Sequence, residues 1–448
     1  MKVLKFGGTS LGNPERMHNV ANIVSGQGKV MVVLSAVAGT TDKLTEIVGL
    51  MKNGDYQAVQ EEVDKLQSHY QQYVSRLFDN EHEISQGHKT TDSYLEEIKS
   101  LASASYVSEF EYQVLAKGEQ ISTALFQQLL NWQGKSSQLL NALDYLQLSQ
   151  NGEPDEEQLK QSLQTKIQAS ADTQIFVIQG FICQDAVGNV SNLKRGGSDY
   201  SASLFGAALN CDEIQIWTDI DGMHNNDPRY VEKTKPIREL SFAEAAELAY
   251  FGAKILHPSS IKPARRADIP VRLLNTLSAK SKGTLISKRV DETGVKAIAA
   301  KSGITAIRIR SSEMLQAQGF LKKIFEVFEL HKTSIDMITT SEVAVSVTID
   351  DTENLATILQ KLSEFSRVEV DSNMTIICVV GAHLAENLEI ISKVISSVKS
   401  IPVRMISYGG SAHNISLLVS GENKISTLKL LHQGIFNVGE IYTGTRHV

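Results

Sequence analysis

Cysteine is scarce in this chain, and long apolar runs are missing. Cys183, Cys211 and Cys378 lie far apart without metal-ligand spacing, so we expect buried thiols in a reducing compartment. No apolar run approaches the ~18 residues that a membrane-spanning helix needs. Lys5 and a glycine pair interrupt the apolar start, which is unlike a signal peptide. These features predict a cytoplasmic protein.

An excess of basic residues is also missing. The chain has 44 Lys and Arg against 51 Asp and Glu, and its net charge of -7 argues against nucleic acid or a membrane surface as a partner. Its 448 residues are too many for one ordinary core, so two to three domains are expected.

Apolar segments alternate with helical ones over residues 1–290. Continuous apolar runs are typical of strands buried on both faces. We expect strands at 1–6, 30–35, 174–182, 213–218 and 269–274, with mainly helical structure from about 43 to 170. Strands separated by helices predict an α/β fold, a three-layer αβα sandwich with a mainly parallel sheet. Ligands of such folds bind beyond the carboxyl ends of the strands.

The pattern changes near residue 290. Residues 303–373 and 374–448 each follow the order of a ferredoxin-like βαββαβ unit, and IDMI and VRMI take the same place in the two copies. A strand at 295–301 is a candidate to complete the second copy, which the sequence leaves open. In the first copy, residues 320–328 are expected to form a helix with one apolar face. Each unit has one uncovered sheet face, which pairing would bury.

Two glycine-containing segments follow the first two expected strands. In KFGGTS, Lys5 supplies a positive charge, and Gly7 and Gly8 let backbone N–H groups approach an anion. In LSAVAGTTDKL, small residues leave room for a ligand, and the hydroxyls of Ser35 and Thr41 suit a carboxylate. An ordinary turn and a helix N-cap are the structural alternatives.

Two further segments carry charges suited to an amino acid. Glu119 in KGEQIST suits an ammonium partner, although a solvated helix position is the more common explanation for such a residue taken alone. In KRGGSDYSA, Arg195 can clamp a carboxylate, and Asp199 can orient a cation or a catalytic lysine. A plain turn is the alternative.

The last two segments fit a nucleotide. WTDIDGMHNNDPR closes a strand with Thr218 and Asp219 and lacks the acidic spacing of an EF-hand. Lys254 stands in the apolar frame FGAKILHP, where it is costly unless it faces an anion such as a phosphate. A lysine that snorkels to the surface is the alternative.

Taken in order, these six segments resemble the aspartokinase family of the amino-acid kinase fold, and the two repeats resemble ACT domains. The narrower resemblance is to the single-function, lysine-sensitive type, carried by ITTSEVAVSVT and RMISYGGSAHNISLLV. It implies a catalytic domain at 1–290 and ACT domains at 303–373 and 374–448. The resemblance covers essentially the whole chain, so chance does not explain it.

The resemblance also implies roles for individual positions. The catalytic positions are Lys5 and Asp199. The substrate-binding positions are Ser35, Thr41, Glu119 and Arg195. The nucleotide-binding positions are Lys5, Gly7, Gly8, Thr218, Asp219, His224, Arg229 and Lys254. Two departures are Lys194, where many relatives have glycine, and His224, where a tyrosine is frequent.

The implied reaction transfers the γ-phosphoryl of ATP, used with Mg²⁺, to the side-chain carboxylate of L-aspartate. No dedicated metal site is expected, because Mg²⁺ is bound mainly by the phosphates of the nucleotide. A kinase for another carboxylate amino acid and a catalytically dead ACT-based sensor are the competing hypotheses.

The resemblance further implies feedback inhibition and assembly. L-Lysine is the expected effector and threonine the alternative. The effector positions are Met314, Phe320, Ser334, Ile335, Asp336 and Ser341. Ala317 replaces a serine of the relatives, which removes one hydroxyl. We expect a homodimer through the ACT domains and leave a tetramer open.

Overall fold

The computed structural model describes residues 1–193, 196–252, 256–288, 293–311 and 318–436. The chain forms two compact units, and each is described by itself. The first contains residues 1–223, 238–242 and 256–290, and the second contains residues 224–237, 243–255 and 291–448. Two short segments from within 1–290 therefore group with the C-terminal part, while the domain boundaries drawn from the sequence stay a prediction.

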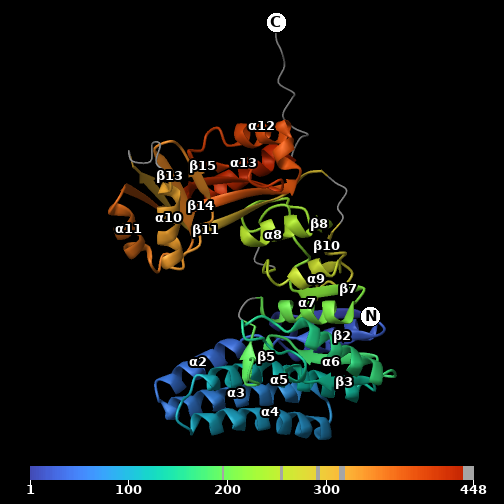
Figure 1. Ribbon diagram of the computed structural model, residues 1–448. Helices are drawn as coiled ribbons and strands as arrows, with labels where there is room; N and C mark the ends of the chain where they lie inside the picture. The colour runs from blue at the N-terminus through green and yellow to red at the C-terminus, as the bar shows by residue number, and fades with distance from the viewer. Residues whose placement is uncertain (194–195, 253–255, 289–292, 312–317, 437–448) are drawn as a thin grey trace. The chain divides into compact units, whose positions relative to one another are not determined.

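The first unit is built around an eight-stranded sheet (Figure 1). Its order is β3-β4-β2-β1-β7-β9-β10-β8, and the only antiparallel pair in this order is β9 with β10. The strands are β1 (Lys2–Phe6), β2 (Val30–Leu34), β3 (Ser137–Leu140), β4 (Ile175–Gln179), β7 (Glu213–Thr218), β8 (Glu239–Ser241), β9 (Val271–Asn275) and β10 (Thr284–Ser287), with a separate hairpin of β5 (Ile182–Gln184) and β6 (Val190–Asn192). The helices are α1 (Pro14–Ser25), α2 (Thr40–Lys52), α3 (Tyr56–Leu77), α4 (Glu81–Ala102), α5 (Glu109–Trp132), α6 (Glu156–Ala169), α7 (Gly197–Leu209) and α9 (Lys262–Arg266).

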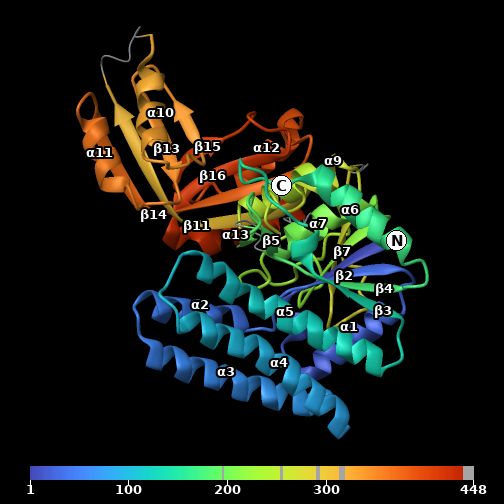
Figure 2. The same ribbon diagram turned by 60° about the horizontal axis from the view of Figure 1, so that its bottom comes forward.

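Helices cover this sheet in two layers (Figure 2). Alternate side chains of β1 face opposite sides, as in any strand. Leu4 and Phe6 join the apolar core formed with α1 to α5, whereas Lys5 points toward α7. Helix α7 packs on β1, β2 and β7 and is flanked by α6 and α9. The α/β fold with a mainly parallel sheet is confirmed.

One local expectation for this sheet was wrong, and one short strand was missed. The run 174–182 is not one strand, because Phe181 adopts a left-handed φ of 67° and separates β4 from β5. The stretch from 43 to 170 also contains the edge strand β3, whose short sequence SQLL has neither strict alternation nor a long apolar run.

The second unit contains a six-stranded antiparallel sheet in the order β12-β13-β11-β14-β16-β15. The strands are β11 (Gly294–Arg310), β12 (Ile338–Thr340), β13 (Ala344–Ile349), β14 (Arg367–Ala382), β15 (Val403–Ser407) and β16 (Asn414–Ser420). The helices are α10 (Phe320–Leu330), α11 (Leu355–Ser363), α12 (Leu388–Ser397), α13 (Lys424–Phe436) and, from Ala243 on, α8 (Phe242–Tyr250).

Two long strands join the two βαββαβ repeats. The strand expected at 295–301 is only the first half of β11, which continues into the first repeat, and β14 likewise runs from one repeat into the other. The first half of β11 pairs with the second half of β14, from Val295 opposite Gly381 to Lys301 opposite Ile376. This pairing supplies the fourth strand of the second repeat.

The apolar face expected on α10 is buried only in part. Phe320, Ile324 and Phe328 are buried in the core of the first repeat. Leu321 and Phe325 are 40% and 42% exposed, because the helix turns them away from that core. An apolar strip therefore remains uncovered on this repeat.

Candidate active site

The carboxyl ends of four neighbouring strands meet at one edge of the large sheet. Parallel pairing aligns Phe6 with Leu34 and with Trp217. The chain stays joined just beyond these ends, since Ser35 N donates to Phe6 O at 3.2 Å and Gly180 N donates to Leu34 O at 2.9 Å. Segments that lie far apart in the sequence are thus brought together where α/β folds bind ligands.

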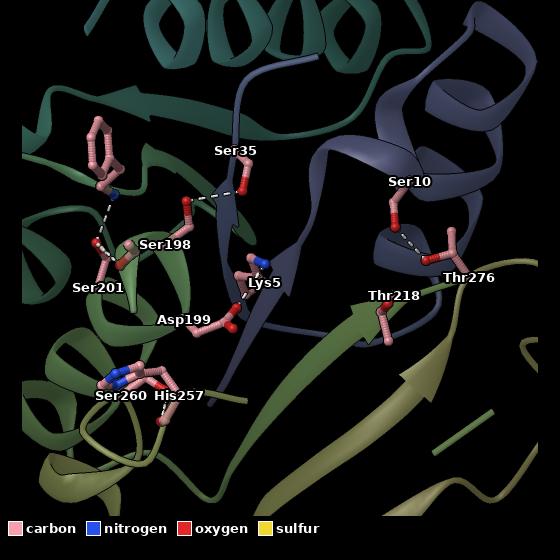
Figure 3. A network of polar contacts seen from close by, with 12 residues as sticks. Lys5, Ser10, Ser35, Ser198, Asp199, Ser201, Thr218, His257, Ser260 and Thr276 are labelled. Atoms are coloured by element: carbon pink, nitrogen blue, oxygen red, sulfur yellow. Dashed lines mark hydrogen bonds and ion pairs between the residues drawn. The ribbon is translucent and has the colours of Figure 1, made fainter. Parts of the chain in front are cut away.

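Lys5 and Asp199 form an ion pair at this edge (Figure 3). The distance from Lys5 Nζ to Asp199 Oδ1 is 2.7 Å, and the two side chains are 13% and 17% exposed. Lys5 comes from β1, and Asp199 comes from the first turn of α7. The carboxylate of Asp199 therefore fixes the direction of the Lys5 side chain.

Backbone packs closely around this pair. A Cβ on Gly8 would lie 2.8 Å from Ala36 O, so only glycine lets the first two loops touch. Gly196, with φ of +76°, precedes α7, whose N-terminus has no side-chain cap. The N–H groups and the helix dipole of such a terminus favour an anion.

Hydroxyl groups link α7 to the loop after β2. Ser35 Oγ donates to Ser198 Oγ at 2.9 Å (Figure 3). Ser122 Oγ donates to Ser35 O at 2.8 Å. Ser198 was missed in the sequence, although it stands beside Asp199 in the same segment. Its position one residue after Gly196–Gly197 was the available signal.

Glu119 is buried in α5 beside the same loop. Its Oε1 accepts the N–H of Ala36 at 3.1 Å. Burial raises its pKa to about 8, although the Ala36 N–H and the charge of Lys5 act in the opposite direction. The surface position considered in the sequence is excluded, because the residue is 4% exposed.

The two threonines at the start of α2 differ. Thr40 is 2% exposed, and its Oγ1 lies 2.8 Å from the hydroxyl of Tyr70. Thr41, which the sequence favoured for substrate contact, is exposed on the first turn. Thr40 therefore anchors the helix, while Thr41 is the one open to a ligand.

The end of β7 carries a second polar group. Thr218 Oγ1 donates to Asp219 Oδ1 at 3.1 Å. Nearby, Ser10 Oγ and Thr276 Oγ1 lie 2.7 Å apart and join η1 (Gly8–Leu11) to the end of β9 (Figure 3). This buried pair was not expected from the sequence, where Thr276 stood in no motif.

Comparison with known proteins gives the family. The model of the amino acid kinase family matches residues 1–275, and an ACT domain model matches residues 377–435. The lysine-sensitive aspartokinase 3 of Escherichia coli is 32% identical, over 97% of this chain and 99% of that protein. The chloroplastic aspartokinase 1 of Arabidopsis thaliana is 30% identical, over 98% and 81%.

The chain belongs to the aspartokinases of the amino acid kinase family. Solved aspartokinases have the same fold. The structure of E. coli aspartokinase III in complex with aspartate and ADP, in the R-state, matches with a TM-score of 0.84 and 32% identity over 97% of this chain and 100% of that chain. The T-state structure, in complex with lysine and aspartate, matches with 0.81 and 31% over 97% and 99%. The resemblance to aspartokinases seen in the sequence is confirmed.

Several expected site residues of this aspartokinase are not part of the described cluster. Arg195 and Lys254 lie outside the described residues. His224 and Arg229 belong to the second unit. There, Nδ1 of His224 lies 3.0 Å from Thr234 Oγ1, and Arg229, 74% exposed, forms a two-pronged ion pair with Asp227.

The expected effector positions of the aspartokinase lie in the second unit, except for Met314, which is outside the described residues together with Ala317. Phe320 is buried at the start of α10, Ile335 is half-buried, and Ser334 and Ser341 are exposed. The Asp336 side chain is only 1% exposed. It already accepts hydrogen bonds from Tyr250 and Lys301.

The described parts of the chain contain no cluster of three or more His, Cys, Asp or Glu side chains placed to hold a metal ion. None of their helices combines the length and the apolar character needed to cross a membrane.

Proposed function

We propose that this aspartokinase transfers the γ-phosphoryl of ATP to the β-carboxylate of L-aspartate, giving 4-phospho-L-aspartate. This reaction is the first step of the aspartate pathway to lysine, threonine and methionine. The Lys5–Asp199 pair beside the buried Glu119, at the carboxyl ends of the strands, is the observation that supports it. E. coli aspartokinase III binds aspartate and ADP in a related structure.

The chemistry needs positioning rather than proton transfer. A carboxylate is already ionised near neutral pH, so the acceptor needs no general base. The difficulty is to bring an anion against a polyanion, which charges and aligned N–H groups overcome. Lys5, held by Asp199, supplies the charge for the transferring group. Mg²⁺, bound mainly by nucleotide phosphates, would neutralise further charge there.

The substrate is recognised at the loop after β2. Glu119 binds the ammonium group of aspartate, and Ser35 and Thr41 offer hydroxyls to its carboxylates. Arg195 clamps the α-carboxylate. The nearby positions of Ser35 and Glu119, joined through Ser122 and Ala36, support this assignment.

The nucleotide is recognised on the other side of Lys5. Gly7, Gly8 and the uncapped start of α7 approach the phosphates. Thr218 and Asp219 lie at the end of the neighbouring strand β7. We assign Arg229, Lys254 and His224 to the same ligand by their motifs.

An ADP-release assay with aspartate, with glutamate and without an acceptor tests this proposal. We expect ADP release with aspartate alone to exceed both other rates by at least about a hundredfold, since glutamate places its carboxylate one methylene too far. Equal rates with glutamate would favour a kinase for another amino acid. No ADP release with any acceptor would favour a dead sensor.

We also propose feedback inhibition by L-lysine through the first ACT repeat. The buried carboxylate of Asp336 is suited to an ammonium group, and E. coli aspartokinase III in the T-state binds lysine. Threonine is the alternative effector. Lysine should lower the initial rate of the wild-type enzyme, and Asp336→Asn should weaken this inhibition at least about tenfold through loss of a charge-assisted contact. Inhibition by threonine alone, or equal inhibition of both proteins by lysine, would contradict the assignment.

Assembly of the enzyme is proposed to occur through the same repeat. Strand β12 lies at the end of its sheet, and Leu321, Phe325 and Ile338 are 40%, 42% and 38% exposed on this repeat. A second copy would cover the edge and these side chains. A tetramer is a further possibility, and the cytoplasm stays the expected compartment from the sequence.

A further inference from the structure

The carboxylate of Asp336 is held by the chain on one oxygen only. Lys301 Nζ donates to Asp336 Oδ1 at 2.8 Å, and the hydroxyl of Tyr250 donates to the same oxygen. The Lys301 ammonium also lies 4.3 Å from the centre of the Tyr250 ring. Burial acts to lower the pKa of Lys301, but its hydrogen bonds to Asp336 and Asp350 outweigh this and raise it.

The second oxygen of this carboxylate is unpaired among the described residues. Asp336 Oδ2 is buried and has no hydrogen-bond partner among the residues that the structure describes. Lys301 also pairs with Asp350 Oδ2 at 2.8 Å, so two carboxylates share one ammonium group. The cluster therefore has one negative charge in excess, which matches one further ammonium group.

Tyr250 is the last residue of α8, and α8 joins the two units along the chain. Phe242, the first residue of α8, belongs to the first unit, and the rest of the helix belongs to the second. Glu247 on the same helix accepts hydrogen bonds from Ser411 at 3.1 Å and from Asn414 at 2.7 Å. Both repeats of the second unit thus hold this helix.

The chain just after α8 lies tightly against β11. A Cβ on Gly252, with φ of +118°, would lie 2.3 Å from Ala300 O, next to Lys301. Gly252 is the second residue of FGAKILHP, the segment that carries Lys254. A change at Asp336 can therefore reach, along a few consecutive residues, the segment that we assign to the nucleotide.

We propose that Asp336 is a two-sided carboxylate whose Oδ1 ties α8 through Tyr250 while its Oδ2 receives the effector ammonium. This rests on the proposed regulation by lysine. An ammonium on Oδ2 withdraws negative charge from Oδ1, and Lys301 moves toward Asp350, its second partner. The Tyr250 hydrogen bond weakens, and α8 loses its tie to the first repeat. Tyr250 is thus a positioning residue that carries the coupling between effector and substrate.

Coupling can be measured without activity. The readout is the ratio of lysine dissociation constants with and without saturating aspartate and ADP, measured by calorimetry on the full-length enzyme. In the wild type we expect a ratio of about 5 to 150, the usual range for coupled sites. Tyr250→Phe keeps the ring over Lys301 and removes only the hydroxyl. We expect it to bind lysine within about threefold of wild type with a ratio near 1.

Tyr408→Phe is the matched control. Tyr408 is 39% exposed, and its hydroxyl donates to Ala385 O of the second repeat at 2.7 Å. It should keep the wild-type ratio. A Tyr250→Phe enzyme with the wild-type ratio, or one that no longer binds lysine, would overturn the coupling role. A wild-type enzyme that binds no lysine would instead overturn the proposed regulation.

Discussion

At the scale of single residues, the proposed phosphoryl transfer depends most on the ion pair between Lys5 and Asp199. Lys5 is mostly buried and paired with Asp199, so its ammonium is held in one direction before any ligand arrives. Such preorganised charge acts where negative charge passes between two anions. A strand can place Lys5 in this way because successive side chains point to opposite faces of the sheet. Lys5 points toward α7, while its neighbours Leu4 and Phe6 enter the apolar core on the other face.

Replacing Lys5 with alanine should abolish most turnover. Loss of one transition-state charge contact should lower kcat by about 10²–10³-fold. The control is Lys2→Ala on the same strand, where the lysine donates to Gln27 Oε1 at 3.3 Å. Steady-state kinetics of both variants, with circular dichroism to check the fold, measure the effect. A Lys5→Ala enzyme with a third of wild-type kcat would show that the role is wrong.

The buried Glu119 should make aspartate binding depend on pH. Its pKa of about 8 means that it is mostly protonated at neutral pH without substrate, whereas an ammonium partner needs it ionised. The KM for aspartate should fall as pH rises, by up to about tenfold per unit below pH 8, and then level off.

Glu119→Gln is the comparison for this pH profile. It should have a high aspartate KM, a nearly unchanged ATP KM and little of the slope. The stability of the fold depends on pH in the opposite sense. Because the pKa of Glu119 is raised in the folded state, its contribution to folding stability is fully present below pH 4.5 and is lost as the pH approaches 8. An unchanged aspartate KM with a raised ATP KM in Glu119→Gln would contradict the assignment.

At the scale of elements, α5 must lie very close to the loop after β2. A Cβ on Gly118 would lie 2.7 Å from the Cβ of Ala36, the residue whose N–H binds Glu119. In Gly118→Ala we expect a loss of about 1–3 kcal/mol of folding free energy from overpacking, and a raised aspartate KM. Urea unfolding and kinetics measure the two effects.

Gly49→Ala is the control for this helix contact. Gly49 lies inside α2 with nothing within 4 Å of a new Cβ, so the change should stabilise by up to about 1 kcal/mol through helix propensity. If Gly118→Ala stabilised the protein equally, the close contact would not be needed for the site.

Sequence patterns predicted the strands of this protein better than its long-range contacts. A continuous apolar run such as 30–34 identifies a buried strand, because every side chain there is buried. The break at Phe181 and the joining of two strands into β11 depend on tertiary pairing, which periodicity does not encode. Likewise, the motif predicted a role for Lys5, which stays a prediction, but it could not predict the Ser35–Ser198 and Tyr250–Asp336 contacts, which link segments far apart in the sequence.

At the scale of the whole molecule, the uncovered strip on the first repeat should hold two chains together. Phe325, on α10, is 42% exposed, so replacing it should leave the fold of its own repeat intact. In Phe325→Asp a carboxylate would have to be buried in the proposed interface, which is costly without a partner. We expect size-exclusion chromatography with light scattering to give a dimer or larger assembly for the wild type and a shift to monomer for the variant.

Val187→Asp, at a position that is 81% exposed in the first unit, should keep the wild-type mass. If Phe325→Asp kept that mass as well, at protein concentrations near those of the kinetic assays, the interface would lie elsewhere on the chain.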